Sequence, residues 1–242
     1  MTRDSASDEV LATLGRCAVP TLNAVLAKSG LGSGHMRNVA PVGPARRFAG
    51  RAVTLRAVPV REDLRRKVAS GELPNLQMEA FERIGPGDVL VIDALADPRA
   101  AVFGDIMATY AGLRGAAAIV LDGVVSDQEG IGKLALPVFA RGNAASSAST
   151  YLHFTELGGT IGCDGIAVLP GDILVGDGNG VVVIPASEAE AVAAAASERE
   201  ELEAFVLERL GAGSPLVGLY PPNDATRAAF QAWRAARPVG GA

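Results

Sequence analysis

The sequence predicts an α/β fold in which one sheet packs against helices. Short apolar runs typical of buried strands occupy the middle of the chain, and helical patterns lie at both ends. Between them, residues 88–122 have the pattern strand, helix, strand. No linker marks a domain boundary, so we expect one domain over residues 1–242. The apolar share of 49% and the charged share of 20% exclude wholesale disorder.

The first part of the chain predicts helices followed by a strand. Residues 8–28 have helical spacing of apolar side chains, and a break is expected before Pro20 because proline disrupts a helix interior. Residues 51–60 alternate and include β-branched side chains, which is typical of a strand. The charged run 61–67 predicts the solvated face of a short helix or a surface excursion.

The centre of the chain predicts a βαβ unit. After the Pro86-Gly87 turn, residues 88–93 form an apolar run of the buried-strand kind. Residues 104–114 have the spacing of a helix that stops at Gly115, and residues 117–122 form a second buried strand. Elements of this length predict parallel strands with a right-handed crossover.

The C-terminal part predicts a hairpin and then helices. Residues 170–177 weakly repeat residues 86–93 and lead through a turn into a strand over 181–184. A helix is predicted over 187–210, with Ser187 and Glu190 as its capping box and Gly211 as its stop. A tail helix is predicted over 224–234, after Pro221-Pro222.

The composition excludes several function classes. With 22 Lys and Arg against 27 Asp and Glu, the net charge is −5, which is unlike a nucleic-acid binder or a protein drawn to anionic membranes. The polar N-terminus lacks the apolar segment of a signal peptide, and the most apolar runs are too short for a membrane helix. Cys17 and Cys163 are too few for a disulfide framework, and we expect both to be buried in a cytoplasmic protein.

Acidic residues gather where the βαβ unit should bind ligands. Asp105 lies at the start of the predicted helix, and Asp122 and Asp127 lie at and just beyond the end of the second strand. These positions share the sheet edge at which α/β folds bind ligands. The amides of Ile106 and Met107 would face the same cleft and could hold a carboxylate or phosphate. Paired acidic oxygens beside an anion site suit Mg²⁺ or Mn²⁺.

Each of these residues also has an interpretation without function. An acid such as Asp105 stabilises the helix dipole wherever it lies in a first turn. Ser126 and Glu129 have the spacing of a capping box, which would explain both residues by helix capping alone. Spacing alone leaves both interpretations open.

Several motifs, in order, resemble one family. They are Gly104-Asp105-Ile106-Met107-Ala108, the run from Ile119 to Asp127, Leu136-Pro137-Val138-Phe139-Ala140-Arg141-Gly142, Pro170-Gly171-Asp172 and Gly180-Val181-Val182-Val183-Ile184-Pro185. Together they resemble the signature of the RraA-like / 4-hydroxy-4-methyl-2-oxoglutarate aldolase family. The resemblance covers about residues 10–210 and leaves residues 211–242 as a tail with a short helix.

The resemblance implies a swivelling β/β/α-type fold with flanking N- and C-terminal helices. It also implies a homotrimer or homohexamer with sites between subunits. The family's chemistry is Mg²⁺-dependent retro-aldol cleavage that releases pyruvate, with oxaloacetate decarboxylation as a related activity. The expected ligands are therefore Mg²⁺ or Mn²⁺ and a small 2-oxo acid, with neither nucleic acid nor membrane as a partner.

Candidate site residues carry over from the family by position. Asp127 matches the metal-binding aspartate, and Asp105 matches the acid that helps to hold the metal's water molecules. The amides of Ile106 and Met107, after Gly104, match the cradle for the pyruvate carboxylate.

Two further matches rest on less specific positions. Glu200 is the nearest match to a metal-binding acid from a neighbouring subunit's C-terminal helix, with Glu203 as the alternative. Asn75 resembles a family asparagine. Helix acids usually face solvent and loop asparagines usually form turns, so all three also have an interpretation without function.

One position departs from the family pattern. The family's Asp-Gly-x-x-Arg-Asp is Asp122-Gly123-Val124-Val125-Ser126-Asp127 here, so a serine replaces the arginine that pairs with the substrate. A hydroxyl lacks the charge and the fork of a guanidinium. Either Arg99 or Arg114 substitutes, or Ser126 serves a different substrate such as a sugar-derived acid, or the aldolase activity is absent.

Other catalytic groups fit less well. A Schiff-base aldolase needs a desolvated lysine, whereas Lys133, between Gly130 and Leu134, is expected to be solvated. His35 could act as a base near the cleft, but it and His153 lie in segments where histidine is usually exposed.

Two hypotheses from different classes follow. The first is a divalent-metal-dependent lyase on a 2-oxo acid. Its catalytic residues would be Asp105, Asp127 and Ser126, with Gly104, Ile106, Met107, Asn75 and Arg99 around the substrate and Asp127, Asp105 and Glu200 on the metal. The second is a non-catalytic regulatory or binding protein, because the family contains an inhibitor of the RNA-degradation machinery. Metal dependence discriminates between the two.

Overall fold

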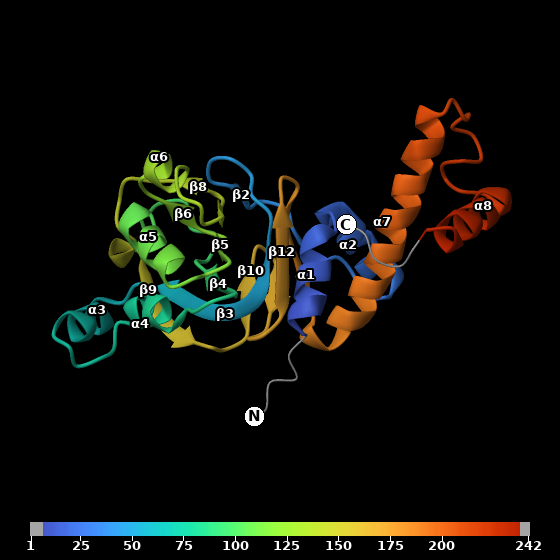
Figure 1. Ribbon diagram of the computed structural model, residues 1–242. Helices are drawn as coiled ribbons and strands as arrows, with labels where there is room; N and C mark the ends of the chain where they lie inside the picture. Colours follow the sequence, from blue (N-terminus) through green and yellow to red (C-terminus); the bar gives the residue numbers. More distant parts are fainter. Residues whose placement is uncertain (1–6, 238–242) are drawn as a thin grey trace.

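A computed structural model describes residues 7–237 of the chain. Its centre is a mixed sheet of nine strands. In sheet order they are β1 (His35–Met36), β13 (Gly180–Ile184), β12 (Ile173–Asp177), β3 (Phe48–Pro59), β4 (Asp88–Asp93), β5 (Ala118–Leu121), β7 (Val138–Ala140) and β2 (Ala40–Pro41), with β9 (Leu152–Leu157) paired to β3 outside that path. The sheet curls into a half-barrel with helices at both ends (Figure 1). The predicted α/β class with flanking helices is therefore confirmed.

The long strand β3 (Phe48–Pro59) organises the sheet. It pairs in parallel with β4 (Asp88–Asp93) and antiparallel with both β12 (Ile173–Asp177) and β9 (Leu152–Leu157). The sequence predicts this strand from residue 51, but it begins at Phe48, where its pairing with Gly176 of β12 starts.

The predicted βαβ unit is present. β4, α5 (Asp105–Leu113) and β5 (Ala118–Leu121) follow one another, and β4 and β5 pair in parallel. β7 (Val138–Ala140) extends the parallel pairing on the other side of β5. The predicted hairpin is also present as β12 and β13 (Gly180–Ile184).

Three helices pack on the β12–β13 end of the sheet. α1 (Asp8–Arg16) and α2 (Val19–Lys28) meet at 109°, and the chain breaks between them, just before Pro20 as predicted. Together with α7 they bury a core that includes Leu14, Leu22, Ile173, Val182 and Val192. Within residues 7–237, no single helix has the length and apolarity to cross a membrane.

Helix α7 (Ala189–Gly211) begins differently from the prediction. The capping box of Ser187 and Glu190 is wrong, because Glu188 occupies the cap position and its side chain makes no capping bond. The 3₁₀ turn η2 (Ala186–Glu188) comes first, and its Glu188 N–H donates to the Pro185 carbonyl at 2.9 Å. This turn removes Ser187 from the cap position. Gly211 is the last residue of the helix, whereas the sequence predicts it as the first residue after the helix.

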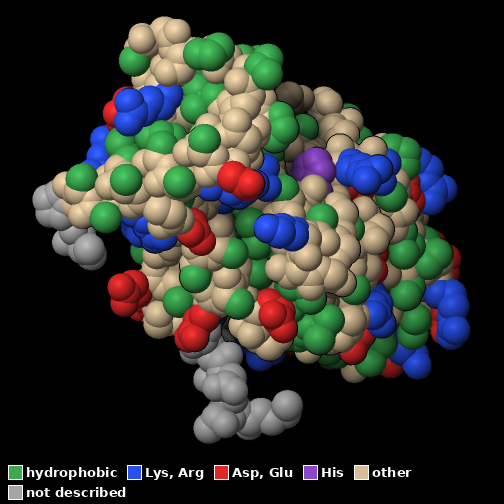
Figure 2. Space-filling model, turned by 90° about the vertical axis from the view of Figure 1, so that its right-hand side faces the viewer, with side chains coloured by type: hydrophobic (Ala, Val, Ile, Leu, Met, Phe, Trp, Pro, Cys, Tyr) green, Lys and Arg blue, Asp and Glu red, His purple; other side chains and the backbone are tan. Residues whose placement is uncertain are grey.

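A C-terminal arm, residues 198–235, projects from the sheet (Figure 1). It consists of the second half of α7 and of α8 (Asp224–Ala235), which Asn223 caps. The rings of Phe205, Phe230 and Trp233 lie 5.5 to 6.0 Å apart and join the two helices. On the face that carries the arm, hydrophobic side chains are exposed among charged ones (Figure 2).

The other elements are short. At the predicted charge run, α3 (Glu62–Ala69) buries no residue, so the expected surface helix is confirmed. Cys17 and Cys163 are buried as expected, and burial raises the pKa of both thiols. The remaining elements are β1 (His35–Met36), β2 (Ala40–Pro41), α4 (Leu76–Arg83), β6 (Val124–Val125), α6 (Gln128–Ile131), β8 (Gly142–Asn143), η1 (Ala148–Thr150), β10 (Ile161–Cys163) and β11 (Ile166–Val168).

Candidate functional site

An open cavity of about 1100 Å³ lies where α5 and α6 begin. Asp105 is the first residue of α5, and Asp127 directly precedes α6. Both aspartates line the cavity, so the fold brings together two acids that are distant in sequence. The lining residues are Gly43, Pro44, Asp105, Asp127, Gln128, Glu129, Gly130, Gly132, Lys133 and Asn143.

Asp127 has an unusual local conformation. Its φ of 52° and ψ of 39° lie in the left-handed region, which residues other than glycine adopt uncommonly. No side chain caps α6, so the capping-box interpretation of Ser126 and Glu129 is wrong. Instead, the Ser126 hydroxyl donates to Asp127 Oδ2 at 2.7 Å. Ser126 therefore fixes the direction of the aspartate, and the carboxylate keeps further lone pairs for a ligand.

Two glycines leave room for the two carboxylates. A Cβ atom on Gly104 would overlap Asp127 Oδ2 and would lie 2.7 Å from Ser126 Oγ. A Cβ atom on Gly130 would lie 2.6 Å from Asp105 Oδ2. Each carboxylate in its present position thus lies where a side chain on the facing glycine would displace it. The closeness of these contacts shows that both acids are built into the packing of the site.

The start of α5 offers unused hydrogen-bond donors. Gly104 occupies the cap position and has no side chain to accept from the first amides. The N–H groups of Ile106 and Met107 belong to this first turn, where the helix dipole also favours an anion. Of the first α5 residues, Asp105 lines the cavity, whereas Ile106, whose side chain is 83% exposed, and Met107 do not.

Three predicted substrate contacts lie elsewhere. Asn75 caps α4 by accepting from the Met78 amide at 3.2 Å, and a contact between Asn75 and substrate stays a prediction. Arg99 pairs with Asp97 at 2.6 Å and stacks on Tyr151 around a different cavity. Arg114 donates to backbone carbonyls of α4 and its cap. None of the three lines the Asp105–Asp127 cavity.

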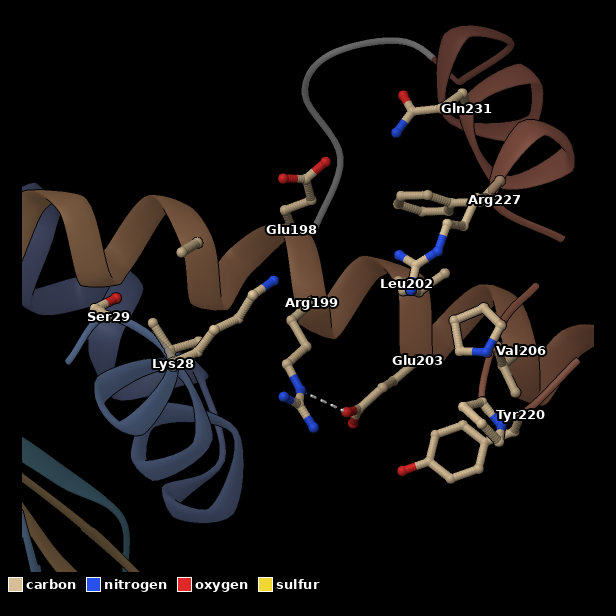
Figure 3. A pocket seen from close by; sticks show the side chains of 15 residues that line it. Lys28, Ser29, Glu198, Arg199, Leu202, Glu203, Val206, Tyr220, Arg227 and Gln231 are labelled. Carbon is tan, nitrogen blue, oxygen red and sulfur yellow. Dashed lines mark hydrogen bonds and ion pairs between the residues drawn. The ribbon is translucent and has the colours of Figure 1, made fainter. Parts of the chain in front are cut away.

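The predicted helix acids have partners within the chain. Glu200 accepts from the Ala18 amide at 2.8 Å, and Ala18 lies between α1 and α2. Glu203 pairs with Arg199 at 3.1 Å in a separate cavity of about 650 Å³ beneath the arm (Figure 3). Neither lines the Asp105–Asp127 cavity of its own chain. A contribution of Glu200 or Glu203 to a neighbouring subunit stays a prediction.

The histidines do not reach the cavity. His35 lies on β1, and its Nε2 is 3.0 Å from the Asn179 carbonyl oxygen at the hairpin turn. His153 lies on β9 and lines a third cavity together with Asn75. Within the part of the chain that the structure describes, the base near the cleft is therefore neither histidine.

Asp122 is a buried acid that binds backbone amides of two loops. Its carboxylate accepts from the amides of Ala94 at 2.7 Å and Asp164 at 3.3 Å and is 4% exposed. Burial raises the pKa of the Asp122 carboxyl above its ordinary value, against the effect of these amides. Asp122 thus holds together the loops that follow β4 and β10, and it does not line the cavity.

Sequence reasoning did not place Asn143 or Lys133 at the cavity. Asn143 reaches the cavity because β6 and β8 pair in parallel and place it beside Val125. Its position directly after the Arg141-Gly142 motif was the available signal. Lys133 is exposed, as expected, but it lines the cavity together with the two aspartates.

The donor set suits a hard cation only in part. Two aspartate carboxylates are the oxygen ligands that Mg²⁺ and Mn²⁺ prefer, and Mg²⁺ commonly takes one or two carboxylates together with water. Within residues 7–237, no group of three or more His, Cys, Asp or Glu is arranged to hold a metal ion alone. Water molecules or a second subunit would have to complete such a site.

Comparison with known proteins identifies the family. A family model described as "RraA-like: Aldolase/RraA" matches residues 7–183. The chain belongs to the RraA-like family. The match includes both aspartates of the cavity and ends before the C-terminal arm of this RraA-like protein.

Two relatives carry aldolase names. A candidate 4-hydroxy-4-methyl-2-oxoglutarate aldolase of Halalkalibacterium halodurans is 37% identical over 135 residues, which are 55% of this chain and 63% of that protein. A candidate aldolase of the same name from Burkholderia mallei is 31% identical over 162 residues, 63% of this chain and 87% of the relative. The aligned part thus spans less than two thirds of the first relative.

Solved structures share the fold. An uncharacterised protein of Pseudomonas syringae aligns with a TM-score of 0.78 and 26% identity, over 89% of this chain and 98% of the other. RraAS2 of Streptomyces coelicolor, described as an unusual member of the RNase ES inhibitor RraA protein family, aligns with a TM-score of 0.76 and 28% identity, over 84% of this chain and 98% of the other.

Proposed function

We propose that this RraA-like protein is a divalent-metal-dependent lyase that cleaves a small 2-oxo acid. The reaction would be retro-aldol cleavage of a 4-hydroxy-2-oxo acid with release of pyruvate, or decarboxylation of the oxaloacetate type. One observation carries the proposal: Asp105 and Asp127, each packed against a glycine, line the cavity at which the capless α5 begins. The names of the aldolase relatives support it.

Asp127 would hold the metal ion, and Asp105 would hold its water molecules. Mg²⁺ or Mn²⁺, when bound, would polarise the 2-oxo and carboxylate oxygens and stabilise the enolate charge. Ser126 would act as a positioning residue, because its hydroxyl already orients Asp127 at 2.7 Å.

The start of α5 would orient the substrate. The amides of Ile106 and Met107 would donate to the substrate's carboxylate, and Gly104 would let it approach the helix end. Asp105 would accept the proton of the 4-hydroxyl through a water molecule during retro-aldol cleavage and return it to the enolate carbon of pyruvate.

Exposed apolar side chains support an assembly. Ile106 and Leu113 are each 83% exposed on α5, and Val217 is 90% exposed on the arm. Exposed large apolar side chains lose contact with water when another subunit covers them. We therefore propose a homotrimer or homohexamer, in which Glu200 or Glu203 of one subunit could approach the cavity of another.

Pyruvate release tests the proposal. Wild-type protein, Asp127→Ala and Asp224→Ala, which makes the same change at the start of α8, would be assayed with oxaloacetate and with 4-hydroxy-4-methyl-2-oxoglutarate, in Mg²⁺ and in EDTA. We expect release that needs Mg²⁺, survives Asp224→Ala and falls at least about a hundredfold in Asp127→Ala. Release that persists in EDTA or in Asp127→Ala would contradict the assignment.

The second candidate is a non-catalytic regulatory protein. The similarity to the Streptomyces protein and the serine at position 126 favour it. It predicts no pyruvate release from either acid and no Mn²⁺ binding that depends on Asp127. Metal binding without release would instead favour an altered substrate, for which the Ser126 hydroxyl replaces a charge with a hydrogen bond.

A further inference from the structure

The cavity contains one cation that has no assigned role. Its lining includes the acids Asp105, Asp127 and Glu129. Among its lining residues, Lys133 is the one lysine or arginine. An anionic substrate near these acids needs a positive charge beyond the metal, and Ser126 does not provide it.

Lys133 is held in place by its backbone and leaves its side chain available. Its N–H donates to the Gly130 carbonyl at 3.1 Å, in the turn that ends α6. Gly132, the residue before Lys133, packs closely against Gly43. A Cβ atom added to Gly43 would lie 2.5 Å from Gly132 Cα. The side chain is exposed, and no ion pair within 4 Å involves it among residues 7–237.

Three arginines elsewhere in the chain already have partners. Arg99 pairs with Asp97 and lines another cavity. Arg114 donates to two backbone carbonyls at 2.8 and 3.2 Å. Arg141 follows β7, and its guanidinium nitrogen lies 3.6 Å from a carboxylate oxygen of the buried Asp164 side chain.

We infer that Lys133 binds a second anionic group of the substrate, remote from the 2-oxo acid head. The head would occupy the amides at the start of α5, and a carboxylate at the far end would pair with the ammonium group of Lys133. Lys133 would then be a specificity-determining residue that favours 2-oxo diacids over 2-oxo monoacids. This inference rests on the proposed function, because it assumes that a 2-oxo acid binds here.

A matched pair of non-cleaved ligands isolates this contact. 2-Oxoglutarate and 2-oxopentanoate have the same chain length and the same 2-oxo acid head, but only the first has a terminal carboxylate. Calorimetric titration with Mn²⁺ present would give both affinities for wild type, Lys133→Ala, Lys133→Arg and Lys67→Ala. Lys67 is a lysine of surface helix α3 and serves as the matched control. Mn²⁺ affinity itself would report whether the site is intact.

The expected result is a change in preference and not in metal binding. Wild type should bind 2-oxoglutarate about tenfold more tightly than 2-oxopentanoate, as for one charge-assisted hydrogen bond. Lys133→Ala should remove this preference, whereas Lys133→Arg and Lys67→Ala should keep it.

Two results would overturn the inference, and they differ in what else they affect. Equal affinities in wild type, or a preference that survives Lys133→Ala, would remove the role of Lys133 and leave the 2-oxo acid site standing. Failure of both acids to bind wild-type protein that holds Mn²⁺ would overturn the proposed function together with this inference.

Discussion

The cavity and the C-terminal arm are stabilised by different kinds of contact. At the cavity, a left-handed aspartate and two glycines bring carboxylates against backbone. In the arm, three aromatic rings join the helices, and exposed ion pairs such as Arg234–Glu201 at 2.7 Å surround them. An added methyl group displaces atoms from a close contact with backbone, whereas a packed cluster loses stability in proportion to the volume that is removed from it.

Gly104→Ala should have the largest effect on the site. The new Cβ atom would overlap Asp127 Oδ2 and displace the carboxylate that Ser126 now orients. We expect Mn²⁺ affinity to fall at least about tenfold to a hundredfold and pyruvate release to fall with it. Titration with Mn²⁺ and the pyruvate assay would measure the two losses.

Gly162→Ala is the matched control. A Cβ atom on this β10 glycine meets no atom within 4 Å, and its backbone is not left-handed. Metal binding should therefore match wild type. If Gly104→Ala binds Mn²⁺ as tightly as Gly162→Ala does, then the close approach of Asp127 to Gly104 has no functional role.

Phe230→Ala should break the arm and spare the cavity. Phe230 is 3% exposed and contacts both Phe205 and Trp233, so truncation should destabilise the packing of α8 by about 3–5 kcal/mol. Hydrogen exchange should show loss of protection over residues 224–235. Mn²⁺ binding should persist, because the cavity is lined by residues between Gly43 and Asn143, and because Glu200 and Glu203 keep their partners Ala18 and Arg199 when α8 detaches.

Val217→Ala provides the comparison for the arm. Its side chain is 90% exposed, so its truncation should change protection of α8 very little. A loss of Mn²⁺ binding in Phe230→Ala but not in Val217→Ala would show that the arm supports the cavity, and the two regions would not be independent.

The parts of the fold that sequence predicted are those with local signals. β4 and β5 follow from uninterrupted apolar runs, and the break before Pro20 follows from proline chemistry. The start of α7 was mispredicted because Ser187 and Glu190 have capping spacing, while the preceding 3₁₀ turn depends on how the chain leaves β13. Spacing cannot show which of two competing turns forms.

For the candidate site, sequence order was enough for some residues only. Asp105 and Asp127 lie at element ends that any βαβ unit brings to one edge. Lys133 and Asn143 reach the cavity through the turn after α6 and the β6–β8 pairing, which depend on contacts between distant segments. Arg99 was placed near the substrate by charge alone, and its pairing with Asp97 directs it elsewhere.

The smallest expected effect concerns charge rather than shape. Burial raises the pKa of Asp122 in the folded protein, so the folded state keeps this proton at pH values where the unfolded chain has released it. The stabilisation from the protonated carboxyl is fully present at pH values below the ordinary pKa of an aspartate, and it is lost as the pH rises through the pKa of Asp122 in the folded protein. Asp122→Asn has no carboxyl at this position and does not lose stability in this way.

Urea unfolding should therefore show that the free energy of unfolding of Asp122→Asn, relative to wild type, increases from about pH 3.5 to about pH 7. A constant difference between Asp122→Asn and wild type would mean that the Asp122 carboxyl has the same pKa in the folded and unfolded states, and burial would then not favour its protonated form.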